Sequence, residues 1–372
     1  MKRLVYADHA ATTPLCDAAW DAMVPFLREE FGNPSSLHGW AKVPRKAIAE
    51  ARATIAKCIG ACPEEIYFTS GGTEADNWVV KGTDGGLMVS AYEHHAVLNT
   101  ASSEAGRGRE VVYVRPKVGG YLMPETITKK WTDGIGLVSV MMANNEIGTI
   151  NPIERLAEAA HKRGALFHTD AVQAVGHIPI DVREMCVDFL SASAHKFNGP
   201  KGIGFLYIRK GLELRQFIYG GQQESGLRAG TENVPSIIGM AAALKYNCDR
   251  MNASVAHLEE LAKRFKDGVD GIAAHVVYLG ADFCPRLPGF ISVAFPGHSA
   301  EGLLYVLDLK GIAVSAGAAC DSKNTQISHV LKSINAPRKI AESTIRISFG
   351  IENTIEDVDA VVCALEKAVR GR

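Results

Sequence analysis

The stretch SASAHKFNGPKGIGFLYIR, Ser191 to Arg209, decides the fold of this chain. An apolar run at residues 187–190 leads into it, and a second run at residues 203–208 lies near its end. Both runs have the length of β-strands and are bounded by turn residues. Lys196 therefore lies where one strand ends and a glycine-rich turn, Asn198 to Gly202, begins. A lysine in such a place can be a plain surface charge. Here, small residues before it and glycines after it leave room for a flat cofactor bonded to its amine.

Composition narrows the classes of protein to consider. A length of 372 residues suits two domains, and 47% hydrophobic with 22% charged residues is ordinary for a soluble globular protein. A net charge of -1 favours neither a nucleic-acid partner nor an anionic membrane. No apolar run reaches the length of a membrane span, and Asp8 and His9 interrupt any export signal at the start. We therefore expect a cytoplasmic protein.

The eight cysteines of the chain show no CxxC pair and no zinc-ligand spacing. Without an export signal they are expected to be reduced thiols. No metal site is predicted.

The middle of the chain repeats one pattern five times: an apolar run ends, polar or glycine residues follow, and a helical stretch comes next. The polar clusters lie at residues 70–74, 92–95, 144–148, 170–173 and 195–196. Strands that alternate with helices predict a mostly parallel sheet with helices on both faces. In an open parallel sheet, ligands bind beyond the carboxyl ends of the strands. We therefore expect the five clusters to lie together at one edge of the sheet.

Each cluster suggests a chemical role beside a structural one. Gly71-Gly72-Thr73 opens a helix whose backbone amides and hydroxyl would hold an anion, although the same residues also make ordinary turns. Asp170 is either an N-cap or the carboxylate that keeps a pyridine nitrogen protonated. His94 is either structural or an imidazole that stacks on an aromatic cofactor and moves protons. Of the two adjacent histidines, His94 rather than His95 is expected to act, since neighbouring side chains diverge.

Helices are expected on both sides of these strands. Apolar residues at helical spacing predict a core-facing helix over residues 43–59. Asn151 is expected to cap a second helix, with Pro152 at its first position, Glu154 completing a capping box and Gly164 at its end.

The second half of the chain predicts a smaller α/β domain. Helical stretches are expected from Pro235 onward and, separately, over residues 255–265, with the change of domain near the start of the second stretch. Strands are expected at residues 292–295 and 345–348. We predict a large domain of residues 15–250, and a small domain made of residues 1–14 and 251–372.

Two residues of the smaller domain are candidates for chemistry. Cys320 lies between small and polar residues in a segment expected to be mobile and exposed, whereas a buried free cysteine is the usual case. Asp321 beside it should disfavour the thiolate. Arg346 lies within an apolar strand, where a charge is costly unless it is paired. An internal salt bridge or a bound carboxylate would each supply the partner.

Over essentially its full length the chain resembles pyridoxal-phosphate enzymes of the class V aminotransferase family, and most closely the cysteine desulfurases. The resemblance rests on the segments at residues 6–14, 31–36, 191–209, 220–233 and 314–325, and on the five clusters. It implies the fold type I of these transferases, pyridoxal 5'-phosphate as cofactor, and a homodimer with composite active sites. The segment around Cys320 is similar to that of the subgroup with a longer mobile loop.

The resemblance also implies a role for each candidate residue. Cys320 would be the nucleophile, Lys196 would bond to the cofactor, and His94 would be the acid/base stacked on its ring. Asn33, otherwise a simple turn asparagine, and Arg346 would contact the substrate. The other implied cofactor contacts, to the phosphate and to the ring, are Gly72, Thr73, Asn145, Asp170, Gln173, Ser193, His195 and, across a dimer interface, Thr231.

These roles imply a cysteine desulfurase that converts L-cysteine to L-alanine and an enzyme-bound persulfide. A sulfur-acceptor protein, in iron–sulfur cluster assembly or in thiolation, would be its partner. A selenocysteine lyase or an aminotransferase on the same fold is the alternative, and transamination would not need Cys320. A non-catalytic interaction protein on a decayed scaffold is a third interpretation, which the intact set of residues disfavours.

Overall fold

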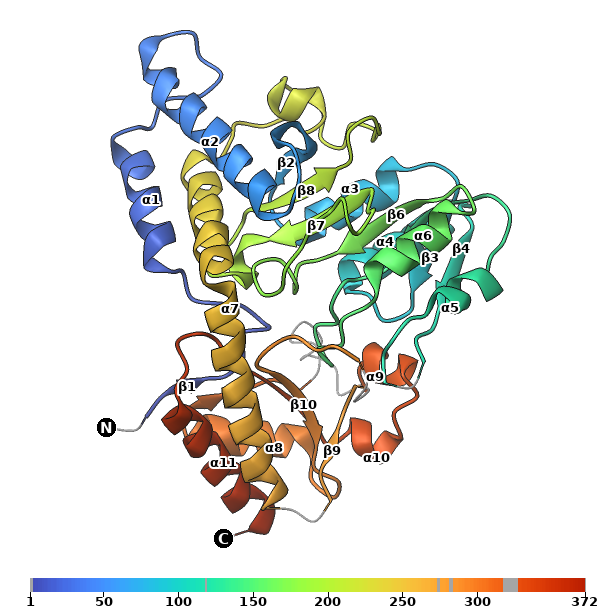
Figure 1. Ribbon diagram of the computed structural model, residues 1–372, viewed down its shortest axis with the longest axis vertical. Coiled ribbons are helices and arrows are strands. Elements are labelled where there is room, and N and C mark those ends of the chain that lie inside the picture. Colours follow the sequence, from blue (N-terminus) through green and yellow to red (C-terminus); the bar gives the residue numbers. More distant parts are fainter. Residues whose placement is uncertain (1–2, 118, 273–274, 281–283, 317–326, 372) are drawn as a thin grey trace.

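The computed structural model describes residues 3–117, 119–272, 275–280, 284–316 and 327–371. A seven-stranded sheet forms the larger part of the molecule (Figure 1). Its strands follow the order β2 (Ile66–Thr69), β8 (Gly204–Ile208), β7 (Phe189–Ser193), β6 (Leu166–Asp170), β5 (Ile135–Ser139), β3 (Gly86–Ser90) and β4 (Val111–Val114).

The direction of the strands confirms the predicted edge. The strands from β7 to β4 are parallel, and β8 is antiparallel to both of its neighbours. Strand β2 therefore runs in the same direction as β7. The carboxyl ends of β2, β3, β5, β6 and β7 consequently lie at one edge of the sheet, as the five clusters predict. Lys196 lies there in the short turn η3 (Ala194–Lys196), directly after β7.

Both faces of this sheet are covered, because alternate residues of each strand join different apolar clusters. Leu87, Leu137 and Phe189 pack in one cluster with α3 (Gly72–Gly82) and α4 (His95–Ala105). Their neighbours Met88 and Val138 pack in another, with α6 (Ile153–His161) and α2 (Lys42–Cys58). The fold is thus the predicted α/β arrangement with helices on both faces, and α2 confirms the helix expected at residues 43–59.

One helix connects the two parts of the molecule. Helix α7 (Val234–Asp270) is continuous over 37 residues, so the expectation of two separate helical stretches is wrong. Its first turns pack with the large sheet through residues such as Ile237 and Leu244, and against α1 (Asp17–Arg28) and α2. Its last turns pack in a different cluster through Leu258 and Phe265. The proposed domain boundary near residue 251 lies inside this helix and stays a prediction.

The smaller part is built on a three-stranded antiparallel sheet. Strand β10 (Phe290–Ala294) lies between β12 (Thr344–Ser348) and β9 (Val277–Tyr278), which confirms both strands predicted here. Strand β1 (Val5–Tyr6) pairs in parallel with β11 (Ile312–Ala313). The chain termini lie at this end of the molecule (Figure 1). The remaining elements are α5 (Pro124–Lys129), α8 (Ala300–Leu309), α9 (His329–Ser333), α10 (Arg338–Ala341), α11 (Ile355–Arg370), η1 (Gly39–Ala41), η2 (Pro63–Glu65) and η4 (Gln223–Gly226). Within the described ranges, no helix has the length and apolar character needed to cross a membrane.

Asn151 does not cap α6, so that prediction is wrong. The helix begins at Ile153, and the side chain of Asn151 turns into the protein, where it is 4% exposed. Its amide nitrogen donates to the Met141 carbonyl at 2.8 Å and contacts the Tyr92 hydroxyl, while its oxygen accepts from the Leu122 amide at 3.1 Å. An asparagine whose amide is fully used by distant partners has nothing left for the helix amides. The local sequence shows that asparagine is a residue type suited to capping, but not which distant partners its side chain will find.

Candidate active site

A cavity of about 270 Å³ lies at the predicted edge of the large sheet. Its lining includes most of the predicted site residues, from every polar cluster of that edge. These residues are Gly72, Thr73, His94, Asn145, Asp170, Gln173, Ser193, His195, Lys196 and Arg346.

Lys196 is held inside this cavity. Its amine donates to the carbonyl oxygens of Ala10 and Ala11, at 2.5 and 2.9 Å, so the interpretation as a plain surface charge is wrong. The glycine-rich turn after it is tight for a steric reason: a Cβ at Gly199 would lie 2.8 Å from Cβ of Ala194. After the turn the chain therefore passes close to η3, and Lys196 lies beside the amino-terminal segment.

The first turn of α3 forms a cradle for an anion. Gly71 has φ of 150° and precedes the helix, and a Cβ at Gly72 would lie 2.6 Å from Cγ2 of Val172. Only glycine leaves the helix amides this accessible. Ser193 lies beside Gly72 at the end of β7, and Thr73 adds a second hydroxyl. These residues open a helix, as expected, and their role toward an anion stays a prediction.

His195 adds a neutral donor to the same cavity. Its Nδ1 lies 3.2 Å from the Thr12 hydroxyl. Burial, and then the charges of Lys196 and Lys201, lower the pKa of His195 to about 4. The ring is therefore uncharged near neutral pH and can bond to an anion through one N–H group.

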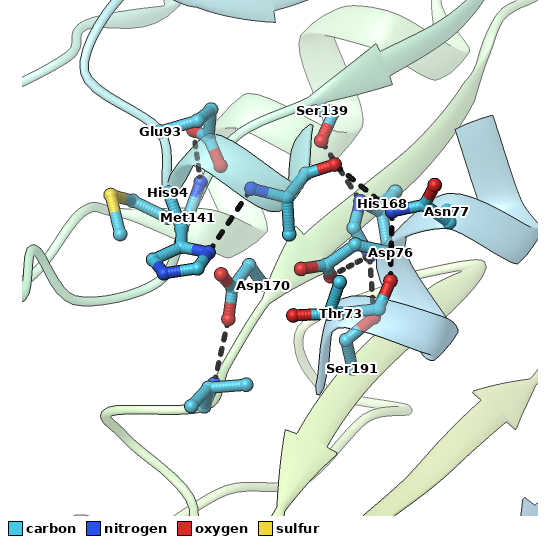
Figure 2. A network of polar contacts seen from close by, with 12 residues as sticks. Thr73, Asp76, Asn77, Glu93, His94, Ser139, Met141, His168, Asp170 and Ser191 are labelled. Carbon is cyan, nitrogen blue, oxygen red and sulfur yellow. Dashed lines mark hydrogen bonds and ion pairs between the residues drawn. The ribbon is translucent and has the colours of Figure 1, made fainter. Parts of the chain in front are cut away.

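Asp170 and His94, both drawn in Figure 2, are two titratable groups that line the cavity. Asp170 ends β6 and accepts a hydrogen bond of 2.9 Å from the Val172 amide, so it also makes a local turn. Burial raises the pKa of Asp170, while His94, the Val172 amide and Lys196 oppose this rise. Nδ1 of His94 accepts from the Ala96 amide at 3.1 Å, so His94 caps α4 with one nitrogen. Burial lowers the pKa of His94 most, which keeps its imidazole neutral near pH 7.

His95 lines the cavity as well, so the two neighbouring side chains do not diverge as assumed, while the expectation that His94 rather than His95 acts stays a prediction. The rings of His94 and His95 are 6.4 Å apart, and the ring of His95 lies 4.5 Å from that of His329. Two adjacent side chains can share a cavity here because the helix starts between them, with His94 extended and His95 helical. Gln173 completes this wall, and its amide nitrogen donates to the Ala10 carbonyl at 2.9 Å.

Arg346 reaches the same cavity from the smaller sheet. It lies in β12, is 2% exposed, and pairs with Asp8 at 2.7 Å. It also donates to the Asn145 carbonyl at 2.7 Å, while its Nε has no hydrogen-bond partner among the residues that the structure describes. Ser315 donates to the other oxygen of Asp8 at 2.8 Å. Both interpretations of Arg346 therefore have support, since it is internally paired and also lines the cavity.

Three predicted residues stand apart from this lining. Asn33 is exposed, and its oxygen accepts from the Ser35 amide at 2.9 Å, as a turn asparagine does. Thr231 is exposed as well. Neither residue lines the cavity of this chain. Cys320 lies outside the described residues.

Sequence reasoning missed two acids, Asp76, which lines the cavity, and Asp8, which pairs with the lining residue Arg346. Asp8 belongs to the quoted amino-terminal segment, and nothing in its local pattern shows that it pairs with Arg346. Asp76 lines the cavity beside Thr73 and Asp170. Because Asp76 follows Thr73 by three positions on α3, helical periodicity could have placed both on one face.

The donor set fits pyridoxal 5'-phosphate. Backbone amides, hydroxyls and a neutral histidine suit its phosphate, and a buried carboxylate suits a protonated ring nitrogen. An amine at Lys196 suits its aldehyde. The cradle at Gly72, which a Cβ would fill, is the observation that speaks for a phosphate-bearing group rather than for a plain aromatic ligand.

Comparisons with known proteins agree with this geometry. The family model of class-V aminotransferases matches residues 5–361. The cysteine desulfurase IscS of Dictyoglomus turgidum is 46% identical over 99% of this chain and 95% of its own length. A solved NifS-like protein, 36% identical, matches with a TM-score of 0.93 over the whole of both chains. A structure of SspA in complex with cysteine, 33% identical, matches with a TM-score of 0.84 over 94% of this chain and the whole of the other. The chain therefore belongs to the class-V aminotransferase family, as a relative of the cysteine desulfurases.

Proposed function

We propose that the protein is a cysteine desulfurase that uses pyridoxal 5'-phosphate to convert L-cysteine to L-alanine and an enzyme-bound persulfide. One observation carries the proposal: Lys196, Asp170 and His94 line a single cavity together with Arg346, which comes from the other sheet. The desulfurase names of relatives that cover nearly the whole chain support the same reaction.

The cavity residues have distinct tasks toward the cofactor. When bound, pyridoxal 5'-phosphate withdraws electrons from the substrate carbon next to the amine. The first turn of α3, with Thr73, Ser193 and His195, would hold its phosphate. Asp170 would face its ring nitrogen, and Lys196 would bond to its aldehyde carbon. Asn145 and Gln173 would contact the hydroxyl oxygen attached to its ring.

Proton transfer falls to two nitrogen bases. Nζ of Lys196 would be the base that takes the proton from the substrate α-carbon. In the neutral imidazole of His94, Nδ1 accepts from the Ala96 amide, so Nε2 carries the proton. To act as the second base, the ring would release that amide and take up the proton at Nδ1. Its lowered pKa suits a base near neutral pH.

The substrate is oriented by charge and cleaved by a thiolate. Arg346, already fixed by Asp8 and the Asn145 carbonyl, would bind the carboxylate of L-cysteine. Asn33 is a second proposed substrate contact, although in this chain it lies outside the cavity lining. The thiolate of Cys320 would then attack the substrate sulfur, and the bond between that sulfur and the β-carbon would break. The sulfur would remain on Cys320 as a persulfide, while the electron pair of the broken bond would stay on the carbon, which takes up a proton to give alanine.

A homodimer would complete the site. Thr231 is exposed in this chain, and the loop that carries it is anchored by Glu224, which pairs with Arg52 at 2.7 Å and accepts from the Phe68 amide at 2.9 Å. Large apolar side chains are exposed on α1, in the segment that follows it and at the start of the Thr231 loop: Trp20, Leu27, Phe31, Leu37, Trp40 and Tyr219. Such a surface suits a second copy of the chain.

Mixed dimers test this arrangement. Protein co-folded from T231A and K196A chains should regain part of the activity that each variant lacks alone, because one composite site is then intact. No recovery in verified mixed dimers would mean that each site is built within one chain.

The proposed place of action is the cytoplasm, with a sulfur-acceptor protein as partner. Every cysteine that the structure describes is a free thiol, which suits a reducing compartment. A persulfide on Cys320 has to be passed on, so a protein that accepts sulfur is the partner implied by the chemistry.

Product analysis tests the proposed function. Purified protein incubated with L-cysteine should release L-alanine, and mass spectrometry should locate a persulfide on Cys320. A keto acid as product, with Cys320 unmodified, would favour the aminotransferase. Turnover of selenocysteine but not of cysteine would favour the lyase.

A further inference from the structure

A buried polar layer lies against the part of the cavity that holds Asp170 (Figure 2). His168 and Asp170 are two residues apart on β6, so their side chains lie on the same face of the sheet. Ser191 on β7 is the register partner of Asp170. Asp76 packs onto this face from α3, with Oδ1 lying 3.6 Å from Nε2 of His168. The four side chains form one buried group. Two of them, Asp76 and Asp170, also line the cavity.

The hydrogen bonds of this layer leave Asp76 without a cationic partner. His168 bonds through Nδ1 to the Ser139 hydroxyl at 2.8 Å, and through Nε2 to the Ser191 hydroxyl at 3.0 Å. The 3.6 Å between His168 and Asp76 is too long for a hydrogen bond. The Ser191 hydroxyl, which bonds to His168, also acts on Asp76, and Oδ1 of Asp76 has no hydrogen-bond partner within the described ranges.

The charges around the three buried acids of this region differ. His94 and Lys196 act on Asp170 and lower its pKa, against the effect of burial. Burial raises the pKa of Asp76 well above its ordinary value, and Asp170 and Glu93 raise it further, while the nearby Ser191 hydroxyl opposes them. Burial also raises the pKa of Glu93 well above its ordinary value. A buried carboxylate that no cation faces takes up a proton, because the charged form costs too much outside water.

His168 cannot supply the missing charge. Burial lowers the pKa of His168 to about 3, so the ring is neutral at physiological pH. Both of its nitrogens are already occupied by hydroxyl groups, which accept and donate equally well. The pair of His168 and Asp76 is therefore a neutral pair rather than an ion pair.

We propose that Asp76 is a positioning residue of the cofactor site, an uncharged carboxylic acid that fixes Ser191 beside Asp170. Asp170 is then the one carboxylate of this layer that faces the ring nitrogen. The inference rests on the proposed function in one respect: the protonated ring nitrogen of the cofactor is taken as the cation that Asp170 binds. A second negative charge at position 76 would leave an uncompensated charge in a buried layer once Asp170 has paired with the ring.

Infrared spectroscopy tests the protonation of Asp76 without any turnover. Protein labelled with carbon-13 in its aspartate carboxyl groups, with or without cofactor, should show the carbonyl band of a protonated acid. The band should shift with the label, disappear in D76N, and persist in the matched variant E93Q, which removes the other buried acid of the region. A wild-type protein that lacks this band, together with a charged His168 in nitrogen-15 NMR, would overturn the proposal and establish an ion pair.

A pH titration of the cofactor absorption tests the positioning role. The titration gives a midpoint pH, at which half of the cofactor bonded to Lys196 is protonated. In D76N this midpoint pH should equal that of the wild type, because asparagine is also neutral and polar. If Asp76 is charged instead, D76N should lower that midpoint by about one unit or more, since a nearby negative charge is lost.

The D76L variant completes this test. Leucine cannot bond to Ser191, so D76L should shift the absorption band or its midpoint, whereas D76N should restore the wild-type values. If D76L also matches the wild type, Asp76 only fills space and the proposal fails. Neither measurement requires cysteine turnover, so such a failure is distinct from a failure of the desulfurase assignment.

Discussion

The two sheets supply the two sides of the cavity in different ways. On the large sheet, His94 and Asp170 each bond to a backbone amide two residues farther along the chain. On the small sheet, Arg346 bonds to Asp8 and to the Asn145 carbonyl, which are 338 and 201 positions away in the sequence. His94 and Asp170 are thus positioned locally at strand ends, while Arg346 is positioned only after the whole chain has folded.

The two sides also differ in buried charge. The layer around His168 and Asp76 is neutral, because burial suppresses the charge of both groups. Arg346, at 2% exposure, keeps its charge beside Asp8. The neutral layer can hold the carboxylate of Asp170 toward a protonated ring nitrogen of the cofactor. The ion pair of Arg346 and Asp8 can bind a second anion, the carboxylate of the substrate. The following variants test this contrast.

The largest effect is expected for K196A on the cofactor side. The variant lacks the amine that bonds to the cofactor, so borohydride reduction should leave no pyridoxyl adduct on the protein. Turnover of cysteine should fall by about a hundredfold or more, since the proton transfer at the α-carbon is also lost. Mapping of the adduct to Lys201 in the wild type would contradict the assignment.

C320S should abolish sulfur transfer while the cofactor side stays intact. Serine is far less nucleophilic than a thiolate near neutral pH, because a thiol has a pKa of about 8.5 and a serine hydroxyl needs a strong base. The cofactor absorption and its change on adding cysteine should persist, with no persulfide on any cysteine by mass spectrometry. Alanine formation at the wild-type rate would exclude Cys320 as nucleophile.

R346A should weaken substrate binding with the cofactor in place. A hydrogen bond to a charged group contributes about 1.5–3 kcal/mol, so kcat/KM for cysteine should fall by roughly tenfold to a hundredfold, through KM. The matched variant D8N keeps an oxygen for the guanidinium and should lose less. Cofactor absorption of each variant controls for folding. Equal losses in R346A and D8N would mean that the ion pair is structural.

The smallest effect concerns the neutral layer and its dependence on pH. The pKa of His168 is about 3 in the folded protein and about 6.5 in the unfolded chain, so the unfolded chain takes up the proton first as pH falls. The wild type should therefore lose stability relative to H168Q below about pH 6.5, by at most about 1.4 kcal/mol per pH unit. Urea unfolding of both proteins between about pH 7 and pH 5 measures this difference. A difference that grows in favour of the wild type would mean a charged His168.

The parts of the site that the sequence predicted share one physical basis. Strand ends followed by polar clusters are local patterns, and the direction of β2, β3, β5, β6 and β7 places them at one edge. The same holds for Gly72 and Thr73, whose position at the start of α3 follows from residue types in a row. Predictions that needed distant partners failed, as for Asn151, whose side chain bonds to Tyr92 and Met141 instead of capping its helix.

By itself, the sequence determined the alternation of strands and helices, and with it the edge where Lys196, Asp170 and His94 lie. Apolar periodicity and turn residues act within a few positions of the chain, so they can be recognised without knowing the fold. Only the tertiary structure decided that Asp8 neutralises Arg346 and that Asp76 lies against His168 and Ser191. Charge and protonation inside a protein depend on burial and on every group nearby, and packing alone brings those groups together.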